Sequence, residues 1–269
     1  MTQIGFIGCG KMAQAMIGGM IRSKTVNPSL IIASATTKET RVKVSDQFGI
    51  EVTGDNSKVA AEADLLFLGI APGLHRQILQ EVKAHLTEET VVVTIAAGLT
   101  TADISAFAEK KLKVVRSMPN TPSLAGEGMS AISTNGEVTD EELHTVLKLF
   151  RSFGKAEVIS EDLMDSIPAI SGSSPAYVYM MIEAMADGGV RQGLPRDQAY
   201  RLAAQAVLGA AKMVLETGKH PGELKDQVTS PGGATIAATE ALEKHRFRGS
   251  ILEAMESCTA RVKELGQKK

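Results

Sequence analysis

Short apolar runs alternate with amphipathic segments over the first 160 residues of the chain. Such continuously apolar runs are typical of strands buried on both faces, as in a parallel sheet covered by helices on each side. The predicted strands are Gln3–Ile7, Leu30–Ser34, Ala63–Ile70, Thr90–Ala97, Leu112–Met118, Met129–Thr134 and Ala156–Ser160. Apolar residues at helical spacing predict helices at Lys11–Arg22 and about Asp140–Ser152, and the charged stretch Lys38–Phe48 is also expected to be helical. This part is therefore predicted to be an α/β domain.

After Ser160 the pattern changes, and no further strand is predicted. Helical periodicity covers the segments 174–193, 195–218, 234–245 and 248–266. Pro195 stands where a helix begins, and Gly193 and Gly218 stand where helices end. The helix Asp197–Glu216 is apolar around most of its circumference, which requires burial either inside a bundle or against another subunit. We place the boundary near Asp162–Pro168, which gives an α/β domain over 1–162 and an all-α domain over 163–269.

Composition excludes several classes of partner. Lys and Arg total 29 against 31 Asp and Glu, so the net charge of −2 gives no reason to expect nucleic acid or an anionic membrane. Cys9 and Cys258 are far apart and belong to no metal-type cluster, and the five histidines (75, 85, 144, 220 and 245) are scattered and are interpreted as surface or capping residues. No signal peptide or long apolar stretch is evident, which predicts a soluble, cytoplasmic protein without a metal or a membrane partner.

A glycine-rich turn joins the first strand to the first helix. Gly8, Cys9, Gly10, Lys11, Met12 and Ala13 form the pattern GxGxxA. In a dinucleotide site the first glycine permits the turn, the second lets the backbone approach a pyrophosphate, and the alanine lets the helix pack closely on the strand. The alternative is a plain tight turn. The position after a first strand, at the start of repeated βα units, favours the dinucleotide and hence a Rossmann-type domain.

The end of the second predicted strand bears on the choice of dinucleotide. NAD sites usually carry Asp or Glu there, bonded to the ribose 2′-hydroxyl. This chain has Ser34, Ala35, Thr36, Thr37 and Lys38 instead, with no carboxylate to repel a 2′-phosphate. The hydroxyls could equally form an ordinary polar loop with a helix cap. The missing acid favours NADPH, with NADH still possible.

A second glycine turn precedes the helix near Ala234. Ser230, Pro231, Gly232 and Gly233 lead into it, and Thr235 adds a hydroxyl. Two glycines at a helix N-terminus expose N–H groups to an anion, and without an arginine cluster the site suits a small carboxylate. Simple capping by Ser230, with the glycines as a hinge, is the alternative.

Three long stretches make the chain resemble the pyrroline-5-carboxylate reductase family. The stretches are HPGELKDQVTSPGGATIAATEALE (220–243), SGSSPAYVYMMIEAMADGGVRQGLP (171–195) and RSMPNTP (116–122), and the resemblance extends over essentially the whole chain. It implies a Rossmann-type domain followed by an all-helical dimerisation domain that interlocks with a partner, in dimers that often assemble further into decamers. It also implies that NADPH reduces a cyclic imine, pyrroline-5-carboxylate, to L-proline, the last step of proline synthesis.

The resemblance also implies roles for single residues. Ser34, Ala35 and Thr36 would face the adenosine 2′-phosphate, with Asn56 beside the adenine ribose and Asn120 and Pro122 near the nicotinamide. Ser230, Gly232, Gly233 and Ala234 would hold the substrate carboxylate, and Thr235 would bond the ring nitrogen as the catalytic contact. The further cofactor contacts implied are Gly8, Cys9, Gly10, Lys11, Met12, Ile70, Ala71, Pro72, Ala97 and Gly98. Each site would combine the nucleotide domain of one chain with the Ser-Pro-Gly-Gly loop of its partner.

Two positions depart from the family pattern, and two other functions compete. Ala71 replaces a common lysine near the cofactor phosphates, and Gly218 stands where some members carry a glutamate. A hydroxyacid dehydrogenase of similar plan would need a lysine in the helix after residue 171, and the segment 171–189 has none. A catalytically idle NADP-binding regulator would have a degraded substrate loop, and this loop is intact.

Overall fold

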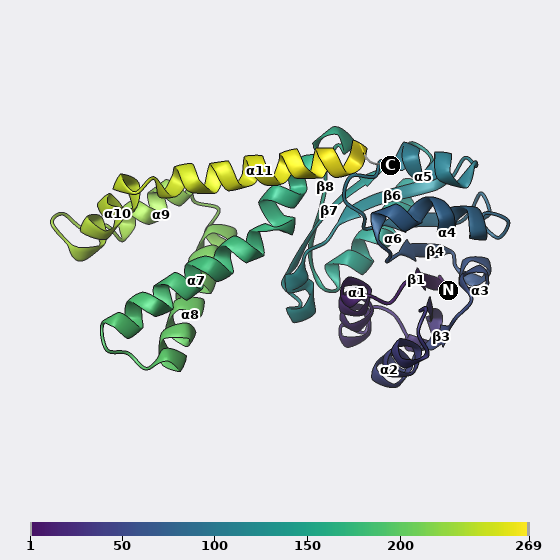
Figure 1. The fold of residues 1–269 in the computed structure, drawn as a ribbon, viewed down its shortest axis with the longest axis horizontal. Helices are drawn as coiled ribbons and strands as arrows, with labels where there is room; N and C mark the ends of the chain where they lie inside the picture. Colours follow the sequence, from purple (N-terminus) through teal and green to yellow (C-terminus); the bar gives the residue numbers. More distant parts are fainter. Residues whose placement is uncertain (1, 268–269) are drawn as a thin grey trace. The chain divides into compact units, whose positions relative to one another are not determined.

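The computed structural model describes residues 2–267 and contains two compact units. The sheet unit comprises the chain up to Ser173 together with the segment from Cys258 onward. The helical unit is Ser174–Ser257. Figure 1 shows the strands and flanking helices of the first unit and the long helices of the second.

One eight-stranded sheet forms the centre of the sheet unit, in the order β3-β2-β1-β4-β5-β6-β7-β8. Its strands are β1 (Ile4–Ile7), β2 (Ile31–Ser34), β3 (Glu51–Thr53), β4 (Leu65–Leu68), β5 (Val91–Thr94), β6 (Lys113–Met118), β7 (Gly128–Thr134) and β8 (Gly154–Val158). All neighbours are parallel except β6 and β7. The seven predicted strands are present, and the short edge strand β3 was not predicted. The order reverses between β1 and β4, which creates a switch point at the carboxyl ends of these strands.

Each face of the sheet is covered by helices, which explains the continuous apolar runs. Leu65 and Phe67 of β4 pack on one side with α1 (Lys11–Arg22), α2 (Lys38–Phe48) and α6 (Asp140–Arg151). Leu66 and Leu68 pack on the other side with α3 (Asn56–Glu62), α4 (His75–Val82) and α5 (Thr101–Ala108). Alternate residues of one strand thus enter two separate cores, as the period of two requires. This is the Rossmann-type arrangement that the sequence predicts.

The segment that follows β8 belongs to the sheet unit, so the division of the chain differs from the boundary expected after residue 162. The 3-10 helix Glu161–Ser166, which precedes the π-helical segment Pro168–Gly172, is held by a buried guanidinium. Arg116 of β6 is 2% exposed and pairs with Asp165. Glu161 accepts hydrogen bonds from the backbone N–H and the hydroxyl of Thr101, both at 2.7 Å. Charge pairs between side chains distant in sequence give no periodic signal, so the sequence pattern could not reveal them.

The helical unit contains α7 (Ser174–Arg191), α8 (Arg196–Thr217), α9 (Pro221–Gln227), α10 (Ala234–Lys244) and the first part of α11 (Phe247–Gln267). The end of α11 returns to the sheet unit, where Val262 is buried and Gly266 lies against Gly98. No strand occurs in Ser174–Ser257, as expected, whereas the short helix α9 was not predicted. Only Ala199 and Ala203 of α8 are buried within the chain. Of the two alternatives left open for this helix, burial inside a bundle of its own chain is therefore not seen, and cover by a second subunit remains.

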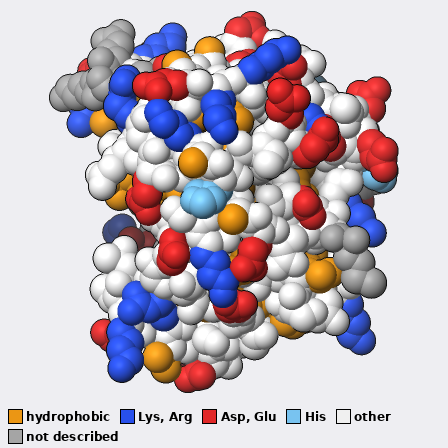
Figure 2. Space-filling model, turned by 90° about the vertical axis from the view of Figure 1, so that its right-hand side faces the viewer, with side chains coloured by type: hydrophobic (Ala, Val, Ile, Leu, Met, Phe, Trp, Pro, Cys, Tyr) orange, Lys and Arg blue, Asp and Glu red, His pale blue; other side chains and the backbone are white. Residues whose placement is uncertain are grey.

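The surface of the sheet unit is mixed in charge. On the face that Figure 2 presents, basic and acidic side chains are interspersed, and hydrophobic side chains are scattered singly between them. In the part of the chain that is described, no helix combines the length and the apolar character needed to cross a membrane.

Candidate active site

Apart from Asn56, which begins α3, the residues expected to bind the cofactor lie at the ends of five neighbouring parallel strands. The Gly8 turn follows β1, Ser34 ends β2, Ile70–Pro72 follow β4, Ala97 and Gly98 follow β5, and Asn120 and Pro122 follow β6. Because these strands are parallel in the order β2-β1-β4-β5-β6, all five segments reach the same edge of the sheet. Ligands of open α/β sheets bind at this edge, beside the switch point.

The two glycines of the first turn are required for different reasons. Gly8 has a φ of +93°, and a Cβ there would lie 2.7 Å from the carbonyl oxygen of Gly69. The fold itself therefore demands glycine at this position. Gly10 has ordinary extended backbone, and apart from its sequence neighbours its Cβ would meet only the Gly69 oxygen, at 3.9 Å, among the described residues. The chain could accommodate a side chain at Gly10, so glycine there fits the close approach of a ligand.

The turn also offers free hydrogen-bond donors. Gly10 is the N-cap residue of α1 and supplies no side-chain cap, so the first N–H groups of the helix point out of the turn unpaired. Such a helix N-terminus favours a phosphate group. Cys9 lies buried in the same turn, and burial raises the pKa of its thiol to about 11, which makes it a packing residue rather than a nucleophile.

Two successive hydrogen bonds start from Ser34, the last residue of β2. Ser34 is 2% exposed, and its hydroxyl donates to Asn56 Oδ1 at 2.6 Å. Asn56 Nδ2 donates in turn to Glu81 Oε1 of α4 at 3.1 Å. Glu81 was not among the predicted site residues, because its approach depends on the packing of α4 beside α3. The Ser34 hydroxyl is thus engaged inside the protein, and Asn56 is the more accessible of the two partners.

A cation also reaches this region. Arg41 of α2 donates from Nη1 to the carbonyl oxygens of Ala35 and Thr36, both at 2.8 Å. It fixes the loop expected to face the 2′-phosphate, and it was missed because only the residues before the helix were considered. Its place in the first turns of the helix after β2 was the available signal. Thr37 caps α2 through its hydroxyl, which bears out the capping alternative at that position.

The loop after β6 uses its asparagine internally. Asn120 Nδ2 donates to the carbonyl oxygen of Ser171 at 2.9 Å, and Oδ1 accepts from the Met129 N–H at 2.9 Å. The side chain therefore anchors the loop that carries Pro122. Pro122 is partly exposed.

The second glycine turn lies in the helical unit and is open. Ser230, Gly232, Ala234 and Thr235 are exposed, and Gly232 has a φ of +67°. The Gly233 N–H already bonds to the Ser230 carbonyl at 3.0 Å, which differs from its expected role as a carboxylate donor. Helix α10 has no side-chain cap, so Ser230 does not cap it and the N–H groups that open the helix are free for an anion. The Thr235 hydroxyl has no hydrogen bond within residues 2–267.

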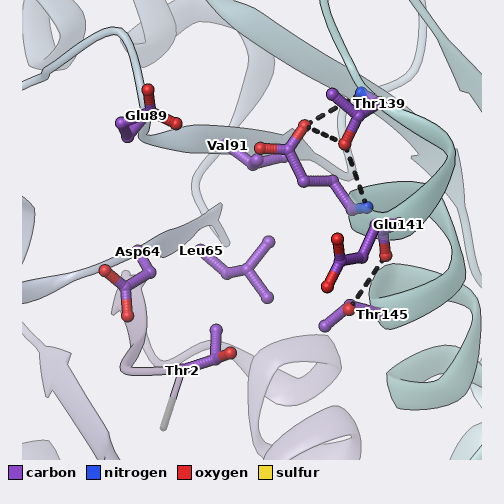
Figure 3. A pocket seen from close by; sticks show the side chains of 9 residues that line it. Thr2, Asp64, Leu65, Glu89, Val91, Thr139, Glu141 and Thr145 are labelled. Carbon is purple, nitrogen blue, oxygen red and sulfur yellow. Dashed lines mark hydrogen bonds between the residues drawn. The ribbon is translucent and has the colours of Figure 1, made fainter.

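A cavity of about 400 Å³ lies at the opposite end of the sheet and is distinct from this site. Figure 3 shows it between β4, β5 and the start of α6, with Asp64, Glu89 and Glu141 around it. Lys113 pairs with Glu89 and Glu142 there, which offsets part of the acidic charge. Within the described range 2–267 no three His, Cys, Asp or Glu side chains are placed to hold a metal ion.

A Rossmann-type sheet with a bare glycine at its first helix, joined to a helical unit with an uncovered apolar surface, defines a dinucleotide-dependent oxidoreductase with an oligomerising domain. Two protein-family sequence models match the chain. The family described as pyrroline-5-carboxylate reductase dimerisation matches residues 161–265, and the family described as NADP oxidoreductase coenzyme F420-dependent matches residues 3–98. The chain is 46% identical over 265 residues to pyrroline-5-carboxylate reductase of Escherichia coli K12, covering 98% of each chain. It belongs to the pyrroline-5-carboxylate reductase family.

Solved structures agree with this assignment. A pyrroline-5-carboxylate reductase from Coxiella burnetii superposes with a TM-score of 0.92 at 33% identity, covering 98% of both chains. A pyrroline carboxylate reductase from Plasmodium falciparum, solved with NADP bound, superposes with a TM-score of 0.89 at 29% identity, also covering 98% of both chains. The resemblance inferred from the three sequence stretches is thereby confirmed.

Proposed function

We propose that the chain reduces pyrroline-5-carboxylate to L-proline with NADPH. Family membership over 98% of the chain is the observation that carries the proposal. The fit of the residues supports it, because the open space at Gly10 and the uncapped N-terminus of α1 suit a pyrophosphate. NADPH, when bound, supplies the hydride for the C=N carbon.

The protein's own residues bind and orient the substrate. A cyclic imine is basic and can arrive protonated, so the site requires no strong acid. The free N–H groups at the start of α10 hold the substrate carboxylate, and the Thr235 hydroxyl accepts a hydrogen bond from the iminium N–H. Catalysis then depends mainly on positioning the imine carbon against the nicotinamide.

Each active site combines the sheet unit of one chain with the Ser230–Thr235 loop of its partner. The loop is exposed within a single chain, and so are the apolar side chains of α8 that a partner would cover. The family model of the helical region describes dimerisation, which supports a homo-oligomer. Assembly of five dimers into a decamer and residence in the cytoplasm are further parts of this proposal, testable by light scattering and by cell fractionation.

A spectrophotometric assay tests the function. Purified protein should oxidise NADPH at 340 nm only when pyrroline-5-carboxylate is added, and proline should accumulate in equal amount. The same assay with NADH measures the cofactor preference. A hydroxyacid in place of the imine, tested in the direction of NADP reduction, serves as the control for the dehydrogenase alternative. Binding of NADPH without turnover of the imine would instead favour an idle regulator.

A further inference from the structure

His75 is buried beneath the cofactor loops, in contrast to the surface or capping role expected for every histidine. It is the first residue of α4 and is 0% exposed. Its Nδ1 lies 3.1 Å from the carbonyl oxygen of Ala71, and its Nε2 lies 3.0 Å from Thr94 Oγ1. Thr94 ends β5 and is also 0% exposed. The ring therefore spans the space between the loop after β4 and the loop after β5.

The partners determine where the protons lie. A carbonyl oxygen can only accept, so Nδ1 carries a proton and donates to Ala71. Thr94 Oγ1 accepts from the Ala96 N–H at 3.2 Å, and its own proton is free to donate to Nε2. The result is one continuous chain, Ala96 N–H to Thr94 to His75 to Ala71, in which every donor has an acceptor. Burial of the ring lowers the pKa of His75, which keeps it in this neutral form.

Both ends of this chain of hydrogen bonds, Ala96 and Ala71, lie in or beside segments expected to contact the cofactor. Ala71 stands between Ile70 and Pro72, and Ala96 directly precedes Ala97 and Gly98. The backbone before Ile70 packs against the Gly8 turn, where a Cβ on Gly69 would lie 2.7 Å from the Gly8 oxygen. A shift of either loop would therefore change the shape of the crevice beside the pyrophosphate turn.

We propose that His75 is a positioning residue for the dinucleotide, a role that rests on the proposed function. As a neutral ring with its proton on Nδ1, it holds residues 70–72 and 96–98 in fixed relation to each other. It touches neither cofactor nor substrate. Its effect is on cofactor affinity, because the two loops must otherwise be ordered when the dinucleotide binds.

Variants of His75 and Thr94, the two side chains in this chain of hydrogen bonds, test the proposal. His75→Leu removes both hydrogen bonds, and Thr94→Val removes the link to β5 while leaving the ring in place. Calorimetry should show the Kd for NADPH raised by about three- to ten-fold in each, the scale of one or two lost hydrogen bonds. The double variant should bind NADPH no more weakly than whichever single variant binds it less tightly, because both changes break the same chain of hydrogen bonds. Thr94→Ser keeps the hydroxyl and should restore wild-type affinity.

Controls separate this role from a general loss of packing. His85→Leu alters an exposed histidine beyond the same helix and should leave the Kd unchanged. His75→Asn keeps a nitrogen in the place of Nδ1 and a fold close to wild type, so it replaces His75→Leu if the latter does not fold. It should lose only the Thr94 link and match Thr94→Val. Long-range ¹H–¹⁵N spectra of the wild-type protein should show His75 protonated on Nδ1 at neutral pH.

An unchanged Kd in folded His75→Asn and Thr94→Val proteins, additive effects in the double variant, or a proton on Nε2 would each overturn the proposal. Failure of the proposed function would look different. The wild-type protein would then fail to bind NADPH or to reduce the imine, while the spectra would still report the tautomer.

Discussion

Phe6, Phe67 and Phe150 in the sheet unit are at most 1% exposed, whereas Met180, Leu202 and Leu215 in the helical unit are 69%, 60% and 80% exposed. The sheet unit closes its two cores with its own helices. The helical unit leaves large apolar side chains uncovered, and each would gain about 1.5–3 kcal/mol from full burial. The sheet unit thus covers its large apolar side chains within one chain, whereas the helical unit leaves a surface that a second chain can cover.

Disrupting the apolar surface of α8 should have the largest effect. Leu208 and Leu215 are seven residues apart on one face of the helix and are 55% and 80% exposed. The double change Leu208→Asp and Leu215→Asp would bury two charges in any interface, so the protein should become monomeric and lose nearly all activity. Light scattering and the imine assay measure both effects, while NADPH binding by the sheet unit should persist.

Val42→Asp is the matched control, because Val42 of α2 is also exposed, at 52%, but lies in the sheet unit. It should leave the oligomer and the activity unchanged. If the Val42 variant dissociated or the α8 variant stayed dimeric, the two units would not differ as the account requires.

The next largest effect concerns the two glycines of the sheet unit. Gly10→Val should fold normally but fill the pyrophosphate space, raising the NADPH KM on the order of 100-fold. Gly8→Val should instead lower the thermal midpoint, since its Cβ clashes with Gly69. Kinetics and thermal unfolding of the two variants separate a ligand requirement from a folding requirement. A folded Gly10→Val protein with ordinary cofactor KM would remove the turn from the site.

A smaller loss of activity is expected when the Thr235 hydroxyl of the helical unit is removed. Thr235→Ala should lower kcat/KM for the imine about ten- to a hundred-fold, the equivalent of a hydrogen bond to a charged group worth 1.5–3 kcal/mol. NADPH affinity should stay nearly constant, and Thr235→Ser should keep much of the activity. If Thr235 only starts the helix, the alanine variant will be less stable yet fully active, and the thermal midpoint measured beside kcat/KM reveals this.

The smallest expected effect is that of His75→Asn on the pH dependence of stability. The pKa of folded His75 lies below the ordinary value of about 6.5, so the unfolded chain takes up a proton first as the pH falls. The stability that neutral His75 contributes to the folded state is fully present above pH 6.5 and is lost as the pH falls below that value. Thermal midpoints measured from pH 5 to 8 at constant protein concentration should therefore fall less steeply on acidification in His75→Asn than in the wild type. Parallel curves would contradict a neutral, buried ring.

Sequence patterns predicted the sheet unit well because burial on two faces leaves a local signal. The runs around Phe6, Phe67 and Val93 could be recognised without knowing their neighbours, and GxGxxA located the switch point. Glu81 and His75 were missed because their partners Asn56 and Thr94 come from elements distant in sequence. Arg41 lies only six residues from its partner Ala35 and was missed because only the residues before α2 were considered. Helix α8 was predicted as an element, but whether its own chain or a partner covers it depends on tertiary packing.

Mixing two defective chains tests most directly whether sites are built across subunits. With both substrates kept below their KM values, Gly10→Val and Thr235→Ala homodimers should each retain at most about a tenth of wild-type activity, and they can be mixed after dissociation and reassembly. If each site joins the sheet unit of one chain to the loop of the other, every mixed dimer has one site with both changes and one with neither. Random mixing should then restore about a quarter of wild-type activity, since half of the dimers are mixed and half of their sites intact. Activity no higher than the average of the two parent proteins would contradict the account.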